Sequence, residues 1–163
     1  MREIRLIGCD ELVYVQQIVF STWPDTYGAI LSAAQIEYML EKFYNLPVLG
    51  KSVKKGYLYY VFFENDLPLG FMAVQPDAVP GSLKVHKLYI LPNHQGKKIG
   101  SGLFTQAETI ARNHGMKRIY LNVNRFNNAV SFYHAMGMRI SGEEDIDIGN
   151  GYLMEDFVME KDL

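Results

Sequence analysis

The sequence predicts an α+β fold built on a mixed β-sheet, and three patterns carry this prediction. Aromatic and β-branched residues gather in short runs between turn residues, which is typical of antiparallel strands. An apolar run at 83–90 is followed by a helical pattern and then by another strand, an order that makes two strands parallel. A Gly-Asn-Gly turn at 149–151 joins two long strands. We expect one domain over residues 1–163, with about seven strands and about four helices.

The chain opens with a strand and two helices. Apolar and charged residues alternate at 2–6, as in a half-buried strand. Asp10 is a candidate cap for a helix that we expect to end around Pro24, because proline disrupts a helix interior. A second helix has a clearer start signal, since Ser32 is followed three residues later by Gln35.

Three antiparallel strands follow these helices. Residues 57–63 and 69–75 flank a cluster of turn residues and predict a hairpin. A break at 76–81 then leads into the strand 83–90. This third strand ends at Pro92, immediately before a short basic loop.

The loop at 95–101 has the composition of an anion site. It contains no proline, so each residue keeps a main-chain N–H, and its two glycines allow close approach to a ligand. The helix that we expect to begin near Ser101 adds unpaired N–H groups and a positive dipole end, and Lys97 and Lys98 strengthen this field. The spacing fits neither a P-loop, which needs lysine at Ser101, nor a dinucleotide fingerprint, which needs glycine at Thr105. We therefore expect a different kind of phosphate ligand.

The last part of the chain supplies a strand, a helix and a hairpin. Residues 119–123 form an apolar run, and Asn127 can cap the helix that ends at Gly137. Two long strands, 138–148 and 152–160, flank the glycine-rich turn. These elements complete the expected seven strands and four helices.

Composition narrows the possible partners. The net charge of −2 gives no sign of a protein that grips nucleic acid through its phosphates. No apolar run approaches the ~20 residues that span a bilayer, so we expect no membrane partner. The single cysteine, Cys9, excludes an internal disulfide and is typical of a cytoplasmic protein. No histidine or cysteine pair has metal-ligand spacing, so we expect no metal.

Two segments resemble the GNAT superfamily of acetyl-CoA-dependent N-acetyltransferases. The stretch from Gln95 to Ser101 is similar to the family's pyrophosphate loop, Gln/Arg-x-x-Gly-x-Gly/Ala, although Lys98 stands at the inner glycine position. The stretch from Asn127 to Met138 is similar to the family's Asn-x-Ala-x-x-Phe-Tyr-x-x-x-Gly-Phe run, with methionine in place of the final phenylalanine. The order of strands and helices also matches. The resemblance implies the GNAT fold, whose seven-stranded mixed sheet splays between two central parallel strands, and acetyl transfer from acetyl-CoA to an amine.

The resemblance also implies roles for single residues. In the family, the pantetheine arm pairs with the main chain before the loop, and a tyrosine at the position of Tyr133 protonates the departing thiolate. From the residues alone, Tyr133 also fits core packing, and Asn127 is also explained as a helix cap. The implied acetyl-CoA-binding residues are Leu88, Tyr89, Ile90, Gln95, Gly96, Lys97, Lys98, Ile99, Gly100, Ser101 and Asn127.

A general base is expected on the strand before the loop. Alternation places Lys84, His86 and Leu88 on one face, and family members often carry glutamate at the first or second of these positions. His86 is the candidate base, directly or through water, because its unperturbed pKa of about 6.5 suits proton removal near neutral pH. A histidine that only hydrogen-bonds within the sheet fits the sequence equally well.

Acidic residues gather in the terminal hairpin, which bears on the acceptor. Such a cluster is typical of a solvated strand face, and its field would also attract a cation. The segments around Tyr27 and at 151–157 are similar to bacterial spermidine/spermine-type acetyltransferases, so a polyamine is one specific candidate among small primary amines. The cluster comprises Glu143, Glu144, Asp145, Asp147, Glu155 and Asp156.

Two alternative functions and the question of a dimer remain open from the sequence. A GNAT-shaped CoA-binding or regulatory module without efficient turnover is favoured by Lys98 in the loop and by His86 where an acid is common. A phosphate-binding fold without acyl chemistry is a more remote reading. The long terminal hairpin also offers an edge to a second copy of the chain, so a homodimer is possible on these grounds.

Overall fold

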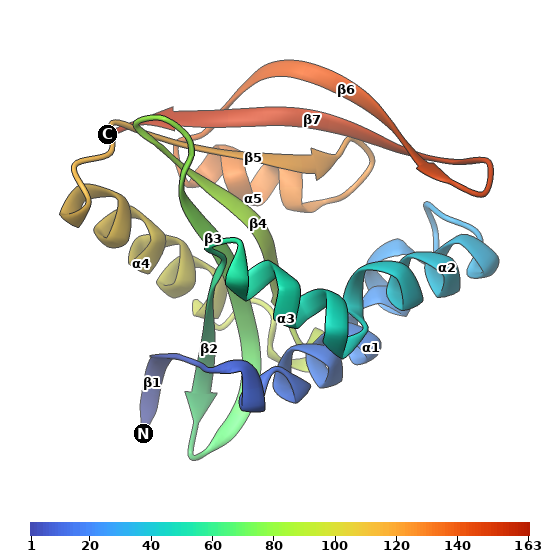
Figure 1. Ribbon diagram of the computed structural model, residues 1–163, viewed down its shortest axis with the longest axis horizontal. Coiled ribbons are helices and arrows are strands. Elements are labelled where there is room, and N and C mark those ends of the chain that lie inside the picture. The colour runs from blue at the N-terminus through green and yellow to red at the C-terminus, as the bar shows by residue number, and fades with distance from the viewer.

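The computed structural model describes residues 1–163 and contains one seven-stranded mixed sheet, in the order β1-β2-β3-β4-β5-β7-β6 (Figure 1). Every neighbouring pair of strands is antiparallel except β4 and β5, which are parallel. The elements are β1 (Arg2–Leu6), α1 (Val13–Tyr27), α2 (Ala33–Tyr44), α3 (Leu46–Lys54), β2 (Leu58–Glu64), β3 (Leu67–Val79), β4 (Ser82–Ile90), α4 (Ile99–Asn113), β5 (Arg118–Asn124), α5 (Ala129–Ala135), β6 (Arg139–Gly149) and β7 (Tyr152–Asp162).

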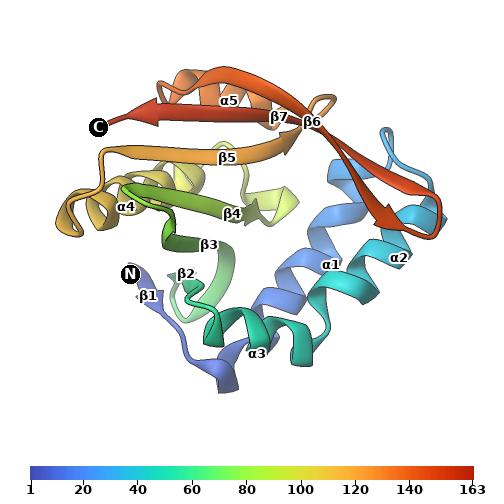
Figure 2. The same ribbon diagram turned by 45° about the horizontal axis from the view of Figure 1, so that its top comes forward.

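The two parallel strands separate part-way along their length. Their pairing ends at Val85 of β4 and Leu121 of β5, and Figure 2 shows the two strands diverging toward their carboxyl ends. On its other side β4 stays paired with β3, but the register shifts so that His86 is an extra residue. Such a β-bulge bends and twists a strand. The bulge therefore lies where β4 turns away from β5.

The bulge also changes which side chains of β4 share a face. Leu88 packs in the core beneath α4, so the prediction that it shares a face with Lys84 and His86 is wrong. Lys87 and Tyr89 instead contact aromatic side chains of the opposite core. One inserted residue inverts the alternation of everything after it. Both lysines, the histidine and Tyr89 consequently face α1, α2 and α3.

Helices cover both faces of the sheet, and each face has its own core. The core beneath α4 and α5 includes Phe104, Leu103 and Tyr133. The core beneath α1, α2 and α3 includes Trp23 and Tyr59, with the tip of the β6–β7 hairpin at its margin. Figure 1 shows this hairpin extending across to α2. The space beside the splay is thus enclosed by helices on one side and by the hairpin on the other.

The first helix runs further than its sequence suggests. Asp10 lies in a short 3₁₀ turn, Cys9–Glu11, before α1 and does not cap it. At the other end we expected α1 to stop around Pro24, but it continues through this residue to Tyr27. Proline removes one helical hydrogen bond, but Trp23 and Tyr27 are both buried, and this packing outweighs that loss.

Other helix ends follow the local chemistry. Ser32 caps α2 by accepting a hydrogen bond from the Gln35 N–H over 3.1 Å, as predicted. The additional helix α3 was not predicted, although Asn45 caps it by accepting from the Val48 N–H over 2.9 Å, and Pro47 stands in its first turn. Its short apolar stripe follows α2 without a clear break, so the two helices are hard to separate by periodicity.

The strand β3 departs from its expected bounds, whereas the turn of the terminal hairpin is as predicted. The strand β3 continues through Pro76 to Val79, where we expected a break, and it does so by a register shift with Asp77 at φ 55°. The predicted glycine turn is present between β6 and β7, with Asn150 at φ 56°. The hairpin tip is anchored on α2, because Tyr38 donates to the Ile148 carbonyl over 2.8 Å.

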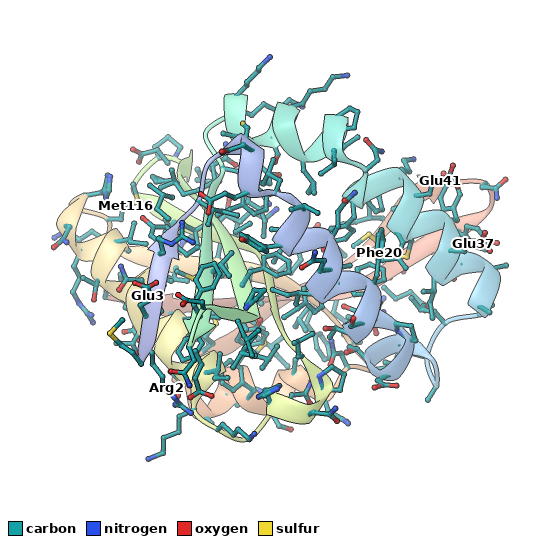
Figure 3. The ribbon with its side chains drawn as sticks, turned by 90° about the horizontal axis from the view of Figure 1, so that it is seen from below. Arg2, Glu3, Phe20, Glu37, Glu41 and Met116 are labelled. Atoms are coloured by element: carbon teal, nitrogen blue, oxygen red, sulfur yellow. The ribbon has the colours of Figure 1, made fainter.

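A separate groove runs along the outer side of the first two helices. Figure 3 views the molecule from below, and there Phe20 of α1 and Glu37 and Glu41 of α2 lie along this groove. The groove contains none of the predicted site residues. In the whole chain, no helix combines the length and the apolar character needed to cross a bilayer.

Candidate active site

A cavity of about 490 Å³ opens beside the splay, on the face covered by α1, α2 and α3. The bulge in β4, the separating end of β5 and the start of α5 form its floor, and the β6–β7 hairpin closes one side. It brings together five of the predicted site residues, namely His86, Leu88, Tyr89, Asn127 and Tyr133.

Of the remaining predicted residues, Ile90 is the last of β4, and the others lie in the loop that follows or in the first turn of α4. Gly96 and Lys98 both adopt positive φ, at 78° and 66°, and Lys98 is the N-cap residue of α4. No main-chain N–H from Gly96 to Ser101 has a hydrogen-bond acceptor within the chain. Six consecutive donors therefore remain free at the positive end of a 15-residue helix, which is the arrangement that binds phosphate groups.

The loop is held in place by contacts on both sides. Gln95 donates from Nε2 to the Ile90 carbonyl over 3.3 Å, which keeps the loop close to the end of β4. Ile99 is fully buried in the core. At Gly100 an added Cβ would lie 3.3 Å from the Phe132 ring, so glycine allows α4 to approach α5 closely. The free N–H groups are consequently on a well-supported turn.

The main chain from Leu88 to Ile90 connects this loop with the cavity. These residues pair with β3 on one side, at Met72 to Gly70. On the other side they have left β5, whose pairing with β4 ended at Val85. The splay therefore exposes a strand edge that an extended ligand can pair with.

Tyr133 lies in α5 at the cavity wall. Its side chain is 6% exposed and packs against Phe104 and Phe132, so the core role considered from the sequence is real. It also faces the cavity, where burial, followed by the nearby Tyr27, raises the pKa of the phenol. The hydroxyl is consequently protonated at neutral pH and available as a hydrogen-bond or proton donor.

Asn127 stands next to Asn128, the N-cap residue of α5, and its side chain caps the first N–H of the helix. Its Oδ1 accepts a hydrogen bond from the Ala129 N–H over 2.9 Å, which confirms the capping role predicted from the sequence. The residue also lies in the cavity wall.

His86 occupies the bulge and is neutral. It stacks on Tyr57, with ring centroids 3.9 Å apart, and its Nε2 lies 2.9 Å from the Oε1 of Gln75. Burial, together with the charges of Lys84 and Lys87, lowers the pKa of His86 to about 3. This side chain can therefore accept a hydrogen bond at neutral pH, but it holds a proton far less readily than an ordinary histidine.

Asp156 is a site residue whose position the sequence did not reveal. The acidic cluster of the terminal hairpin was expected to be a solvated strand face, and Glu143, Glu144 and Asp145 are indeed exposed. Asp156 is instead 2% exposed and lies in the cavity wall. Its side-chain hydrogen-bond donor is the Asn122 amide, at 3.4 Å, and burial raises the pKa of the carboxyl group. Because side chains alternate along a strand, the sequence could have indicated that Asp156 and its neighbour Glu155 lie on opposite faces of the sheet.

This combination of a free-amide loop, an open strand edge and a lined cavity agrees with the family comparison. The model of the acetyltransferase (GNAT) family matches residues 14–138 of the chain. The chain belongs to the GNAT acetyltransferase family. The predicted family and the predicted acyltransferase class are therefore confirmed.

Several GNAT relatives extend over almost the whole chain. A spermidine N(1)-acetyltransferase of Thermoplasma acidophilum is 28% identical over 159 residues, which cover 94% of this chain and 95% of the relative. The crystal structure of the PaiA N-acetyltransferase from the same organism, in complex with coenzyme A, is 27% identical, with a TM-score of 0.85 and coverage of 100% and 99%. A GCN5-related N-acetyltransferase from Rhodopseudomonas palustris, 17% identical, has a TM-score of 0.86 and coverage of 100% and 96%. The expected splayed GNAT fold is thus confirmed.

Proposed function

We propose that this GNAT protein binds acetyl-CoA at the splay and transfers the acetyl group directly to a primary amine. The observation that carries the proposal is the continuity between three parts of the site. The six free N–H groups from Gly96 to Ser101 lead to the open edge of β4, and this edge leads into the cavity that contains Tyr133.

The residues of the loop suit the diphosphate of coenzyme A. Main-chain donors from Gly96 to Ser101 would bind the phosphate oxygens, and Lys97 and Lys98 would add positive charge. The open edge at Leu88, Tyr89 and Ile90 would pair with the pantetheine arm, and the Asn127 amide would contact its end. The relative whose structure contains coenzyme A, at 27% identity over the full chain, supports this assignment.

Tyr133 is the proposed acid for the departing sulfur. As the amine nitrogen forms its bond to the acetyl carbon, the carbon–sulfur bond breaks and the thiolate takes the phenolic proton of Tyr133. A phenol whose pKa is raised by burial remains protonated until the reaction requires it. Main-chain N–H groups at the open edge of β4 would stabilise the carbonyl oxygen as its charge increases.

The acceptor amine would approach from the cavity. Asp156, its one carboxylate, would hold the incoming ammonium group. His86 would then act on the amine proton, directly or through a water molecule, with Nδ1 as the acceptor. Because the pKa of His86 is about 3, we propose that the amine proton does not stay on the ring and passes from Nδ1 to solvent water.

A polyamine is a specific acceptor to test within the amine class. The support is the name of the spermidine N(1)-acetyltransferase relative, at 28% identity, together with the buried carboxylate of Asp156.

A homodimer is a further proposal, because β6 forms one edge of the sheet and pairs only with β7. Sedimentation equilibrium would test it.

Calorimetry with acetyl-CoA and desulfo-CoA is the first test of the proposed function. We expect both acetyl-CoA and desulfo-CoA to bind. When an amine panel that includes spermidine is added together with acetyl-CoA, we expect free thiol to be released. Binding without thiol release for any amine would favour the alternative, a GNAT-fold CoA-binding or regulatory module. Absence of binding would refute both.

A further inference from the structure

The charges around the acceptor cavity are unequal. Asp156 is its only acidic side chain, whereas four lysines line it. None of these lysines lies within 4.0 Å of a carboxylate, although ion pairs occur elsewhere in the chain. The lysines are Lys51 and Lys55 at the end of α3 and Lys84 and Lys87 on β4.

Lys87 shows that this excess is built into the cavity wall. Its Nζ lies 4.4 Å from the centroid of the Tyr44 ring and 3.3 Å from the Tyr59 hydroxyl. Burial lowers the pKa of Lys87 to about 8, so Lys87 is still charged in most molecules at pH 7. A buried cation without a carboxylate is costly, and an anionic ligand beside it would offset that cost.

The lysines are brought together by the bulge and by α3. The extra residue at His86 turns Lys84 and Lys87 to the same face of β4. The α3 side of the cavity lies over the neighbouring strands, where the Lys55 carbonyl accepts a hydrogen bond from Gln75 of β3 over 3.0 Å. The phosphate loop is not part of this wall, so its anion site is distinct from the lysines.

The α3 lysines, Lys51 and Lys55, lie across the splay from Asp156, whereas Lys84 is close enough to Asp156 for its charge to oppose the rise in the pKa of that carboxyl group. Asp156 is on β7, beyond β5, while the end of α3 that carries Lys51 and Lys55 lies over β3 and β2, through the Lys55–Gln75 and Ser52–Tyr59 hydrogen bonds. Neighbouring strands are about 4.8 Å apart, so a molecule that reaches from the splay to the α3 lysines spans roughly two strand spacings, on the order of 10 Å.

We infer that the preferred acceptor is an amine that carries an anionic group at its far end, and not a polyamine. The amine would reach the splay beside Asp156, and the anionic group would lie toward Lys51, Lys55 and Lys87. The inference rests on the proposed acetyl transfer and refines its substrate class. A polyamine would place further positive charge where the cavity is already positive, which electrostatic complementarity disfavours.

Three acceptors of equal length test this inference, since they differ only in the charge at the far end. They are 6-aminohexanoate, hexylamine and 1,6-diaminohexane, compared by kcat/KM in a thiol-release assay with acetyl-CoA. We expect the amino acid to exceed hexylamine by about tenfold and the diamine to fall below hexylamine. A fourth acceptor, 6-aminohexyl phosphate, is compared with 6-aminohexanoate to show whether the cavity favours a phosphate or a carboxylate. Spermidine is assayed beside them.

Charge reversal on α3 provides the matched variants. In K51E/K55E, whose two positions are solvent-exposed, the ratio of 6-aminohexanoate to 1,6-diaminohexane should invert. K54E changes an exposed lysine of the same helix outside the cavity and should keep the wild-type ratio. Lys87→Met, which retains the apolar stem, should bring the ratio close to one.

Two results would overturn the inference. One is a wild-type preference for the diamine or spermidine over the amino acid. The other is a ratio that responds equally to K51E/K55E and K54E. If coenzyme A binds but no amine is acetylated, the proposed function fails by itself, and calorimetry of 6-aminohexanoate against hexylamine on the CoA-bound protein decides the charge preference. Equal or absent binding of the two would then refute it.

Discussion

His86 donates from Nε2 to Oε1 of Gln75 over 2.9 Å, and this contact determines the chemistry of the histidine. The Gln75 amide nitrogen donates to the Lys55 carbonyl over 3.0 Å, which turns the amide oxygen toward the ring. The ring must then carry its proton on Nε2, since an amide oxygen only accepts. Nδ1 is left as a hydrogen-bond acceptor at the cavity.

The depressed pKa of His86 predicts a pH-dependent stability. Above pH 6.5 the histidine is neutral in both states, and its contribution is complete. Between about 6.5 and about 3 the unfolded chain binds a proton that the folded chain refuses, so the free energy of unfolding falls as pH falls, by up to about 1.4 kcal/mol per pH unit. In urea titrations between pH 7 and pH 4, the free energy of unfolding should fall less steeply with falling pH in His86→Asn than in the wild-type protein. Identical slopes would mean that the folded pKa is not depressed.

Removal of the Tyr133 hydroxyl should slow turnover without weakening cofactor binding. General acid catalysis contributes about 10²–10⁴-fold, so Tyr133→Phe should lower kcat by about 10²-fold or more. Its affinity for CoA, measured by calorimetry, should stay unchanged because the ring and its packing remain. Tyr60→Phe, which removes a hydroxyl outside the cavity, should leave kcat as it is. An unchanged kcat in Tyr133→Phe would exclude the acid role.

Asp156→Asn should separate stability from activity. The carboxylate is buried with one long hydrogen bond from Asn122, and burial raises its pKa, so the neutral amide should be at least as stable at pH 7. The KM for the amine should rise by about tenfold or more, because the ammonium group loses its counter-charge. Glu155→Gln, at the exposed neighbouring position, is the control. A lower stability with unchanged KM would make Asp156 purely structural.

The strained loop residue allows a test of the phosphate site. Lys98 adopts φ 66°, where a side chain costs about 1–2 kcal/mol and glycine costs backbone entropy of about 0.5–1 kcal/mol instead. Lys98→Gly should therefore stabilise the protein by about 0.5–1 kcal/mol, and CoA affinity should change little because the main-chain N–H remains. Lys97→Gly, at a residue without positive φ, should be destabilising. Strongly impaired CoA binding in Lys98→Gly would assign the contact to the side chain.

Local chemistry in the sequence was sufficient for most of the elements. The Ser32 cap, the Asn127 cap and the glycine turn at 149–151 each depend on residues close together in the chain, and the structure contains all three. The order of elements, with one helix between two strands, likewise determined that β4 and β5 are parallel. These features follow from hydrogen bonds and backbone preferences that operate over a few residues.

The chemistry of the cavity depended on tertiary structure. A bulge at His86 is a mismatch between two strands, so no pattern within β4 could reveal that Lys87 joins Lys84 on one face. Asp156 looked like one acid among several, and it is buried because β7 pairs between β5 and β6 with this side chain in the cavity wall. The sequence by itself determined the family, the order of the elements along the chain and the position of the loop before α4, because these rest on local signals. Which charges meet the acceptor was decided by register and packing between distant segments, where a shift of one residue changes the face of every side chain that follows.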